Sequence, residues 1–136
     1  GKALIFVSST RSADNLVEKL KKNKIKAVAI HSQKSQGARR NNLEEFKVNG
    51  AQILVATDLI GRGIHIDDLP CVINYELPRS PLDYIHRIGR TGRAGEKGTA
   101  ISILTHDELQ HFRVIQKKMG KKVTLQRTGD IDLHGY

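Results

Sequence analysis

Cysteine, tryptophan and long apolar runs are scarce or missing in this chain of 136 residues. The one cysteine, Cys71, cannot form an internal disulfide, and its apolar neighbours indicate a small buried side chain rather than a reactive thiol. The histidines and this cysteine lack the spacing of zinc ligands, so we expect no metal site. Neither a signal peptide nor a bilayer-spanning run is evident. We therefore expect no membrane partner and a cytoplasmic location, or a nuclear one in a eukaryote.

Acidic and aromatic residues are also few. The chain has 23 Lys+Arg against 14 Asp+Glu, a formal net charge of +9. Such an excess favours a polyanionic partner, through attraction to phosphates and release of their counterions, but does not distinguish RNA from DNA or an acidic protein. The aromatic residues are scattered, and Phe6 and Phe46 lie at core positions, so no platform for base stacking is predicted.

Apolar runs alternate with segments of helical periodicity. Strands are predicted at 3–8, 27–31, 53–56, 71–75 and 99–104; helices are predicted after Ser9–Thr10, over 35–48, from Pro81, and over 107–119. This alternation predicts an α/β fold, one domain with a mainly parallel sheet flanked by helices on both faces. Polar loops at 8–11, 31–39 and 57–65 follow three strands, so we expect them at one edge of the sheet, where such folds bind ligands. Five lysines between residues 19 and 26 are interpreted mostly as a solvated face.

The segment His86–Arg93 holds three arginines, a histidine and two glycines. Arginine presents five donors in a rigid fork that suits phosphate, and glycine lets a ligand approach the backbone closely. The alternative is a solvated basic turn. Because the segment lies between a predicted helix and the apolar strand at 99–104, we favour a polyphosphate or nucleic-acid site.

Four segments in order resemble those of DEAD-box RNA helicases, within helicase superfamily 2: 3–10 (motif IV), 31–46 with Gln36 and Arg39 (motif IVa), 55–58 with 62–64 (motif V) and 86–95 (motif VI). The resemblance covers residues 2 to about 120. It implies a three-layer RecA-like (P-loop NTPase-like) domain, the second lobe of such a helicase, over 1–120. Residues 121–136 would then be a C-terminal extension or linker.

The resemblance also implies roles in ATP hydrolysis. Arg90 and Arg93 would be arginine fingers that contact the ATP phosphates, which suits a reaction catalysed by positioning and charge neutralisation. Arg62, Gly63 and His65 would belong to the nucleotide site. His86 and Arg87 resemble residues that tie motif VI to the other lobe or to neighbouring motifs, and a purely structural role for these two stays open.

The implied RNA contacts lie on three segments. They are the main chain near Ser32, the Arg39 side chain, and Thr57 with Asp58, where the threonine hydroxyl would donate to a phosphate. Contacts of this kind grip the sugar–phosphate backbone and read no sequence. We therefore expect RNA binding without sequence preference from this lobe.

Two residues depart from the family pattern. Where the family has Arg-Gly-x-Asp, with an aspartate that accepts hydrogen bonds from the ATP ribose, this chain has Arg62–Gly63–Ile64–His65. A neutral imidazole offers one acceptor and its cation offers none, so we expect weakened ribose contacts and nucleotide affinity that falls as His65 protonates. Asp67 and Asp68 are close enough in sequence to substitute in part. Ser32 replaces a common glycine but keeps the backbone amide.

The phosphate-binding loop and the Asp-Glu-Ala-Asp segment of these helicases do not occur in this chain. In the family both belong to the N-terminal RecA-like lobe, which would hold most of the Mg²⁺ that accompanies ATP. We therefore expect no ATPase from this lobe alone. Two alternatives remain: a non-catalytic RNA-binding scaffold, with His65 as the symptom of lost turnover, and a DNA helicase lobe of the same superfamily. The sequence gives no indication of the RNA target or the oligomeric state.

Overall fold

The computed structural model describes residues 2–48, 50–58, 60, 69, 71–78, 80–88, 99–103 and 110–114. Strands and helices alternate as the sequence predicts, with element ends within one or two residues of the expected ones. In chain order they are β1 (Ala3–Val7), α1 (Thr10–Lys22), β2 (Ala27–Ile30), α2 (Gln36–Lys47), β3 (Ile53–Thr57), β4 (Cys71–Asn74), α4 (Pro81–Ile88) and β5 (Thr99–Ser102).

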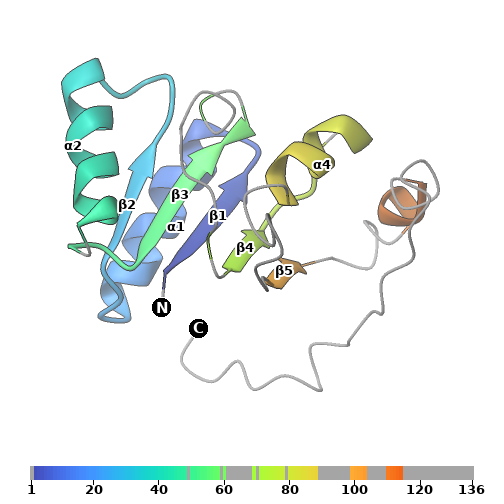
Figure 1. Ribbon diagram of the computed structural model, residues 1–136, viewed down its shortest axis with the longest axis horizontal. Helices are drawn as coiled ribbons and strands as arrows, with labels where there is room; N and C mark the ends of the chain where they lie inside the picture. Colours follow the sequence, from blue (N-terminus) through green and yellow to red (C-terminus); the bar gives the residue numbers. More distant parts are fainter. Residues whose placement is uncertain are drawn as a thin grey trace.

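The strands form one five-stranded sheet in the order β2-β3-β1-β4-β5, and all four neighbouring pairs are parallel. Ala3 at the start of β1 lies between Ile53 of β3 and Cys71 of β4, so the strands begin nearly level. Figure 1 shows all the arrows pointing the same way, so the chain leaves every strand at the same edge of the sheet. The helices α1, α2 and α4 follow β1, β2 and β4. The α/β prediction with a parallel sheet is therefore confirmed.

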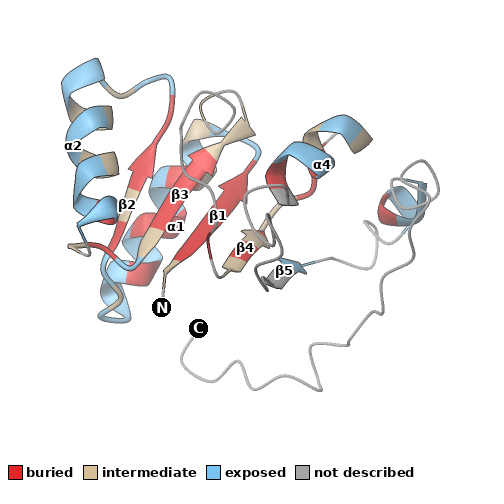
Figure 2. Ribbon diagram, viewed as in Figure 1, coloured by how far each residue is buried: buried red, intermediate tan, exposed pale blue. Residues whose placement is uncertain are grey.

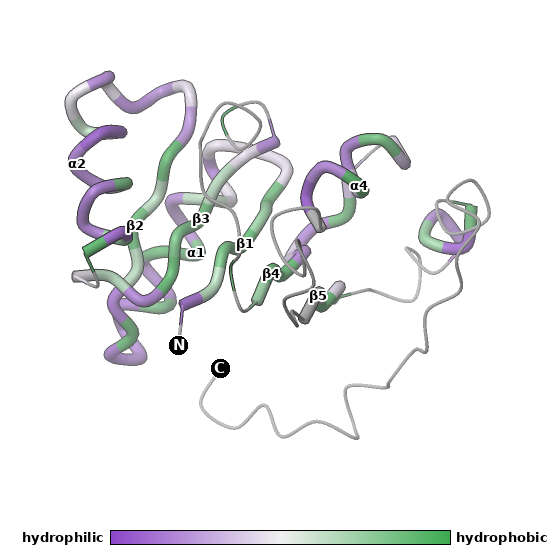
Figure 3. Tube along the Cα trace, in the orientation of Figure 1, coloured by the Kyte–Doolittle hydropathy of each residue, from purple (hydrophilic) through white to green (hydrophobic). Residues whose placement is uncertain are grey.

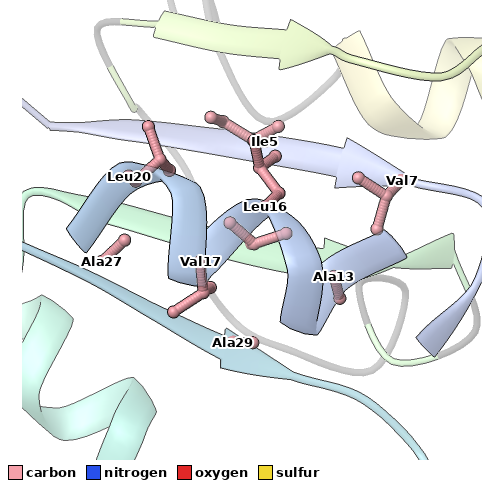
Figure 4. Packing of buried hydrophobic residues seen from close by; sticks show 9 residues of the cluster. Ile5, Val7, Ala13, Leu16, Val17, Leu20, Ala27 and Ala29 are labelled. Carbon is pink, nitrogen blue, oxygen red and sulfur yellow. The ribbon is translucent and has the colours of Figure 1, made fainter. Parts of the chain in front are cut away.

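Helices cover both faces of the sheet, and the alternation of side chains along each strand divides the core in two. Leu4 and Phe6 face the side on which Phe46 of α2 packs. Ile5 and Val7 face α1, which contributes the apolar side chains Ala13, Leu16, Val17 and Leu20 (Figure 4). Figure 2 shows the resulting pattern, with buried central strands between helices whose outer faces are exposed. Phe6 and Phe46 are core residues, as predicted.

Serine residues begin three of the helices. The Ser9 hydroxyl accepts a hydrogen bond from the Ser12 amide (3.1 Å), and Ser35 does the same for α2. Ser80 accepts from the Asp83 amide, so Pro81 occupies the first helical position of α4, where its missing N–H costs nothing. These caps satisfy amides that the first turn leaves unpaired, which explains why the chain enters its helices at these points.

The C-terminal part of the described chain packs against α4 and the segment that precedes it. Residues 110–114 are helical, within the helix predicted over 107–119. Phe112 is buried and meets the Tyr84 ring edge to face, with centroids 5.7 Å apart, and His111 hydrogen-bonds to the Pro78 carbonyl. The predicted extension at 121–136 lies outside the described residues, so the proposed domain boundary stays a prediction.

Two further observations concern predictions from composition. Cys71 is half-buried rather than fully buried, and burial raises the pKa of its thiol. Among the described residues, no helix has the length and apolar character to cross a bilayer.

Candidate nucleic-acid and nucleotide site at the carboxyl edge

Polar segments follow four neighbouring strands at the carboxyl edge of the sheet. Because all the strands are parallel, the residues after β1, β2, β3 and β4 meet at this edge. The predicted convergence of the loops after β1, β2 and β3 is confirmed for their described residues. Hydrogen bonds and ion pairs then fix several of these segments to one another.

Arg87, in the last turn of α4, is the largest fully buried side chain among the described residues, with 1% of its surface exposed. Its Nε donates to Asp58 Oδ1 at 2.5 Å and its Nη2 to Asp58 Oδ2 at 2.7 Å. Bidentate pairs of this kind are the strongest form of arginine–carboxylate hydrogen bonding. A buried charge is tolerated only when it is paired in this way, so the Asp58 carboxylate is committed to Arg87.

Further contacts extend the Arg87 site to two more strands. Nη1 donates to the Glu76 carbonyl and to Asn74 Oδ1 (3.3 Å), and the guanidinium stacks 5.2 Å from the centroid of the Phe6 ring. Arg87 thus joins α4 to β1, to β4 and to the end of β3. Its ion pair with Asp58 is a direct link between the segment 86–95 and the end of β3, and the role that the resemblance implies for Arg87 stays a prediction.

His86 lies on the exposed side of α4, and no hydrogen bond from it to another described residue is present. Thr57, the last residue of β3, is half-buried beside Asp58, and its hydroxyl has no partner within the described part of the chain. Of the neighbours Thr57 and Asp58, the threonine therefore remains available to a ligand, while the aspartate is occupied by Arg87.

The turn after β2 is held by His31, which is 2% exposed. Its Nδ1 accepts from the Gln33 amide (3.2 Å), so its Nε2 carries the proton and donates to Asp14 Oδ1 (3.0 Å). Burial alone would raise the pKa of Asp14, but the hydrogen bond from His31, together with the Lys34 ammonium at 3.6 Å, holds that pKa below its ordinary value. Ser32 is exposed and lies in this turn, which the bonds of the Gln33 and Lys34 amides to His31 hold in place.

Arg39 lies in the first turns of α2, at the same edge. Its side chain is half-buried, and its Nε is the one buried side-chain nitrogen or oxygen among the described residues without a hydrogen-bond partner. An unpaired buried donor on a cation is costly unless a ligand supplies the acceptor. Together with the exposed Ser32 at the start of the same loop, this atom suits an anionic ligand.

Glu76 and Asn74 are two residues of the site that the sequence analysis missed. Glu76 Oε1 accepts from the Ser8 amide (2.8 Å) and Oε2 from the Ser12 hydroxyl (3.2 Å), which joins the loop after β4 to the start of α1. The sequence position of Glu76 could have identified it as a site residue, because it follows a buried strand at the carboxyl edge. Asn74, fully buried, was a polar residue inside an apolar run.

Five predicted site residues lie outside the described part of the chain: Arg62, Gly63, His65, Arg90 and Arg93. The helix that leads into the arginine-rich segment is described, and it is fixed at its C-terminal end by Arg87. In the described ranges, no group of three or more His, Cys, Asp or Glu side chains is arranged to hold a metal ion.

A parallel sheet covered on both faces, with an arginine-anchored helix at its carboxyl edge, defines a RecA-like lobe. Residues 1–95 match the family described as "Helicase conserved C-terminal domain". The chain belongs to this family, and it is a C-terminal RecA-like lobe of the DEAD-box type.

Named relatives agree with this assignment. The ATP-dependent RNA helicase DBP8 of Lodderomyces elongisporus is 40% identical over 130 residues, which cover 96% of this chain and 29% of the relative. The DEAD-box ATP-dependent RNA helicase 30 of Arabidopsis thaliana is 45% identical over 116 residues, 85% of this chain and 20% of the relative. The chain thus spans less than a third of the length of these relatives.

Solved structures share the fold closely. A DEAD box protein from Methanococcus jannaschii superimposes with a TM-score of 0.85 at 45% identity, over 89% of this chain and 33% of that one. The C-terminal domain of the DEAD-box protein Dbp5 gives 0.80 at 35% identity, over 88% of this chain and 71% of that one. Dbp5 of S. cerevisiae has also been solved bound to RNA and ADP BeF3, again with a TM-score of 0.80 at 35% identity, over 88% of this chain and 32% of that one.

Proposed function

We propose that this lobe belongs to an ATP-dependent RNA helicase, in which it supplies arginine fingers to ATP hydrolysis and grips one RNA strand for local duplex unwinding. The observation that carries the proposal is the Arg87–Asp58 pair. It joins the end of β3, where Thr57 would contact RNA, to α4, which leads directly into Arg90 and Arg93. A shift at the RNA site or at the nucleotide site would therefore be transmitted to the other site through this buried ion pair.

Backbone contacts to RNA would come from Thr57, Arg39 and the amide of Ser32. The Thr57 hydroxyl and Arg39 Nε both lack protein partners among the described residues, and Ser32 stands on the turn that His31 fixes. All three groups donate hydrogen bonds, as phosphate recognition requires, and none reads a base edge. Asp58, which the resemblance implies as an RNA contact, would instead orient the end of β3 through its ion pair with Arg87.

ATP, when bound with Mg²⁺ between the two lobes, would supply the phosphoryl group that is transferred to water. Arg90 and Arg93 would contact its phosphates across the cleft and neutralise the charge that develops during transfer. Most of the Mg²⁺ ligands would belong to the N-terminal lobe of the same protein. The isolated C-terminal lobe would accordingly bind RNA weakly, in a salt-sensitive manner, and hydrolyse no ATP.

RNA-stimulated ATPase of the full-length protein tests this function. Arg90→Ala and Arg93→Ala should each lower the rate by about 10³-fold or more, because each removes charge stabilisation from the transition state. The exposed Arg113 is a matched control, and Arg113→Ala should leave the rate unchanged. A wild type that binds RNA but hydrolyses no ATP would instead establish the non-catalytic scaffold.

A substitution at His65 tests the proposed contribution of this residue to ATP binding. His65→Asp should tighten ATP binding by the full-length protein, since it restores an acceptor for the ribose hydroxyls. In the wild type, ATP affinity should fall between pH 8 and pH 6 as the imidazole gains a proton. An affinity that is constant over this range, and unchanged in the variant, would remove His65 from the nucleotide site.

A further inference from the structure

Seven lysines gather at the amino edge of the sheet, opposite the candidate site. We call them the amino-edge lysine cluster: Lys2, Lys19, Lys21, Lys22, Lys24, Lys26 and Lys47. They come from the residues before β1 and β2 and from the ends of α1 and α2. Figure 1 places these chain ends together at the edge where the strands begin, and Figure 3 shows the turn between α1 and β2 as strongly hydrophilic.

Backbone and side-chain hydrogen bonds bring the members of the cluster together. The Lys26 carbonyl accepts from the amides of Gln52 and Ile53, and the Gln52 carbonyl accepts from the Ala3 amide. Lys26 and Lys2 therefore flank the start of β3, with their backbones about 10 Å apart at ordinary strand spacing. The Lys2 ammonium in turn donates to the Lys47 carbonyl at 2.9 Å, which adds the end of α2 to the cluster.

Most charges of the cluster are exposed, and the half-buried Lys2 ammonium lies 5.1 Å from the centroid of the Phe46 ring. Every member except the half-buried Lys2 is exposed, and none forms an ion pair with a carboxylate of the described residues. The acidic residues on the same helix ends are Glu18, Glu44 and Glu45. Helix dipoles explain the lysines in the last turns of α1 and α2, but Lys26 lies beyond α1, at the entry to β2.

Lys24 adds a second, independent observation. It is the one described non-glycine residue with positive φ, at 62°, and its amide and that of Ile25 bond back to the Lys21 and Leu20 carbonyls. Glycine is strongly favoured at this position after a helix because a Cβ is strained there. The chain therefore carries a lysine where the backbone prefers glycine, at the centre of an exposed cationic cluster.

We propose that the amino-edge lysine cluster binds the phosphates of an RNA segment extending beyond the carboxyl-edge site. This inference rests on the proposed function, which supplies the RNA. Flexible ammonium groups fit a phosphate backbone rather than bases, and the Phe46 ring beside Lys2 is buried in the core, so it offers no face to a base. The two edges are separated by the length of a five-residue strand, roughly 16 Å, which a single strand spans easily. The bound segment would be read by charge alone, so this surface adds affinity for longer RNAs without adding sequence preference.

Two RNAs of different length test the proposal in the full-length protein. One occupies only the carboxyl-edge site, and the other carries a single-stranded extension. The combined Lys22→Gln, Lys24→Gln and Lys26→Gln variant should bind the extended RNA about 5-fold more weakly per lost phosphate contact at 0.1 M salt. Its plot of log affinity against log salt should be shallower by about 0.7 per contact. Affinity for the short RNA, and the ATPase that this RNA stimulates, should be unchanged.

Two further variants separate the cluster from folding and from general charge. Lys24→Gly should weaken binding of the extended RNA while raising the melting temperature, because it removes a contact but relieves the strained backbone. Arg113→Gln, which removes a charge elsewhere, should bind both RNAs as the wild type does.

Equal losses for both RNAs, or an equal loss in Arg113→Gln, would overturn the proposal in favour of general attraction. So would binding of the extended RNA that no variant weakens. Lysine-dependent binding to vesicles containing phosphatidylserine, with extended-RNA binding unchanged, would also overturn it. Wild-type ATPase stimulated by the short RNA tests the proposed function separately, so the two can fail independently.

Discussion

The two edges of the sheet use charge in opposite ways. At the carboxyl edge Arg87, Asp58, Glu76 and His31 are wholly or partly buried, and each has a fixed partner. Arg87 is bonded to Asp58, Glu76 accepts from the Ser8 amide, and His31 is bonded to Asp14. At the amino edge every lysine of the cluster except the half-buried Lys2 is exposed, and none is paired with a carboxylate of the described residues. Paired, buried groups hold a fixed geometry, whereas exposed lysines on flexible stems provide charge without one. A site that must position a reacting phosphate needs the first arrangement, and a surface that only retains a polyanion needs the second.

The largest effect should come from breaking the buried pair at the carboxyl edge. Arg87→Ala leaves the Asp58 carboxylate and the Asn74 side chain without their cationic donor, so the free energy of unfolding should fall by about 3–5 kcal/mol. Urea denaturation measures this loss. His86→Ala, on the exposed side of the same helix, should change stability by less than about 0.5 kcal/mol. Equal losses in the two variants would contradict the central place given to Arg87.

At the amino edge, Lys24→Gly should stabilise the fold. Relief of the left-handed conformation should add about 1 kcal/mol to the free energy of unfolding. Urea denaturation again gives the value, and Lys22→Gly, inside the last turn of α1, is the matched control. The control should destabilise by a similar amount, because glycine is unfavourable within a helix. Destabilisation by Lys24→Gly would mean that its side chain makes contacts the fold needs.

A smaller and pH-dependent effect is expected at Asp14. Its pKa is lower in the folded protein than its ordinary value of 3.8, so the ionised carboxylate stabilises the fold. This contribution is complete above the unfolded pKa and is lost as the pH falls through the lower folded pKa. Stability measured from pH 7 to pH 2 should therefore show a difference between wild type and Asp14→Asn that shrinks below about pH 4. A difference that is independent of pH would show that the interaction with His31 does not depend on charge.

The smallest effect should come from the amino-edge lysine Lys26. Lys26→Gln should change the free energy of unfolding by less than about 0.5 kcal/mol, because the side chain is exposed and has no ion pair with the described residues. The same substitution at Lys34, which lies 3.6 Å from Asp14, offers a comparison at the other edge. A clear loss in Lys26→Gln would show that the cluster contributes to the fold as well as to its surface.

The elements of this fold were accessible from the sequence because their signals are local. The apolar run of β1 is buried on both faces, and the apolar spacing of α1 matches one side of a helix, so each could be identified without its neighbours. The convergence of the polar loops also followed, since a parallel sheet places all carboxyl ends at one edge.

The pairings within the site were not accessible in the same way. Arg87 and Asp58 are 29 residues apart, and they meet only because β1 lies between β3 and β4 in the sheet, which brings α4 near the end of β3. Strand order is a property of the packed sheet, and no local periodicity encodes it. For the same reason Glu76, 68 residues from the Ser8 amide that it accepts from, was missed.

The Arg87 site also constrains how this sequence can diverge. Loss of either charge leaves the other buried without a partner, which destabilises the fold. Replacing both residues with apolar ones of similar volume need lower the stability little. We therefore expect positions 58 and 87 to change together or not at all. Position 74, whose side chain accepts from Arg87, should change when they do. Related chains that depart from this set at one position only should carry a compensating change at another. Among divergent relatives, joint variation at these positions would mark lobes in which the link between β3 and α4 has been rebuilt.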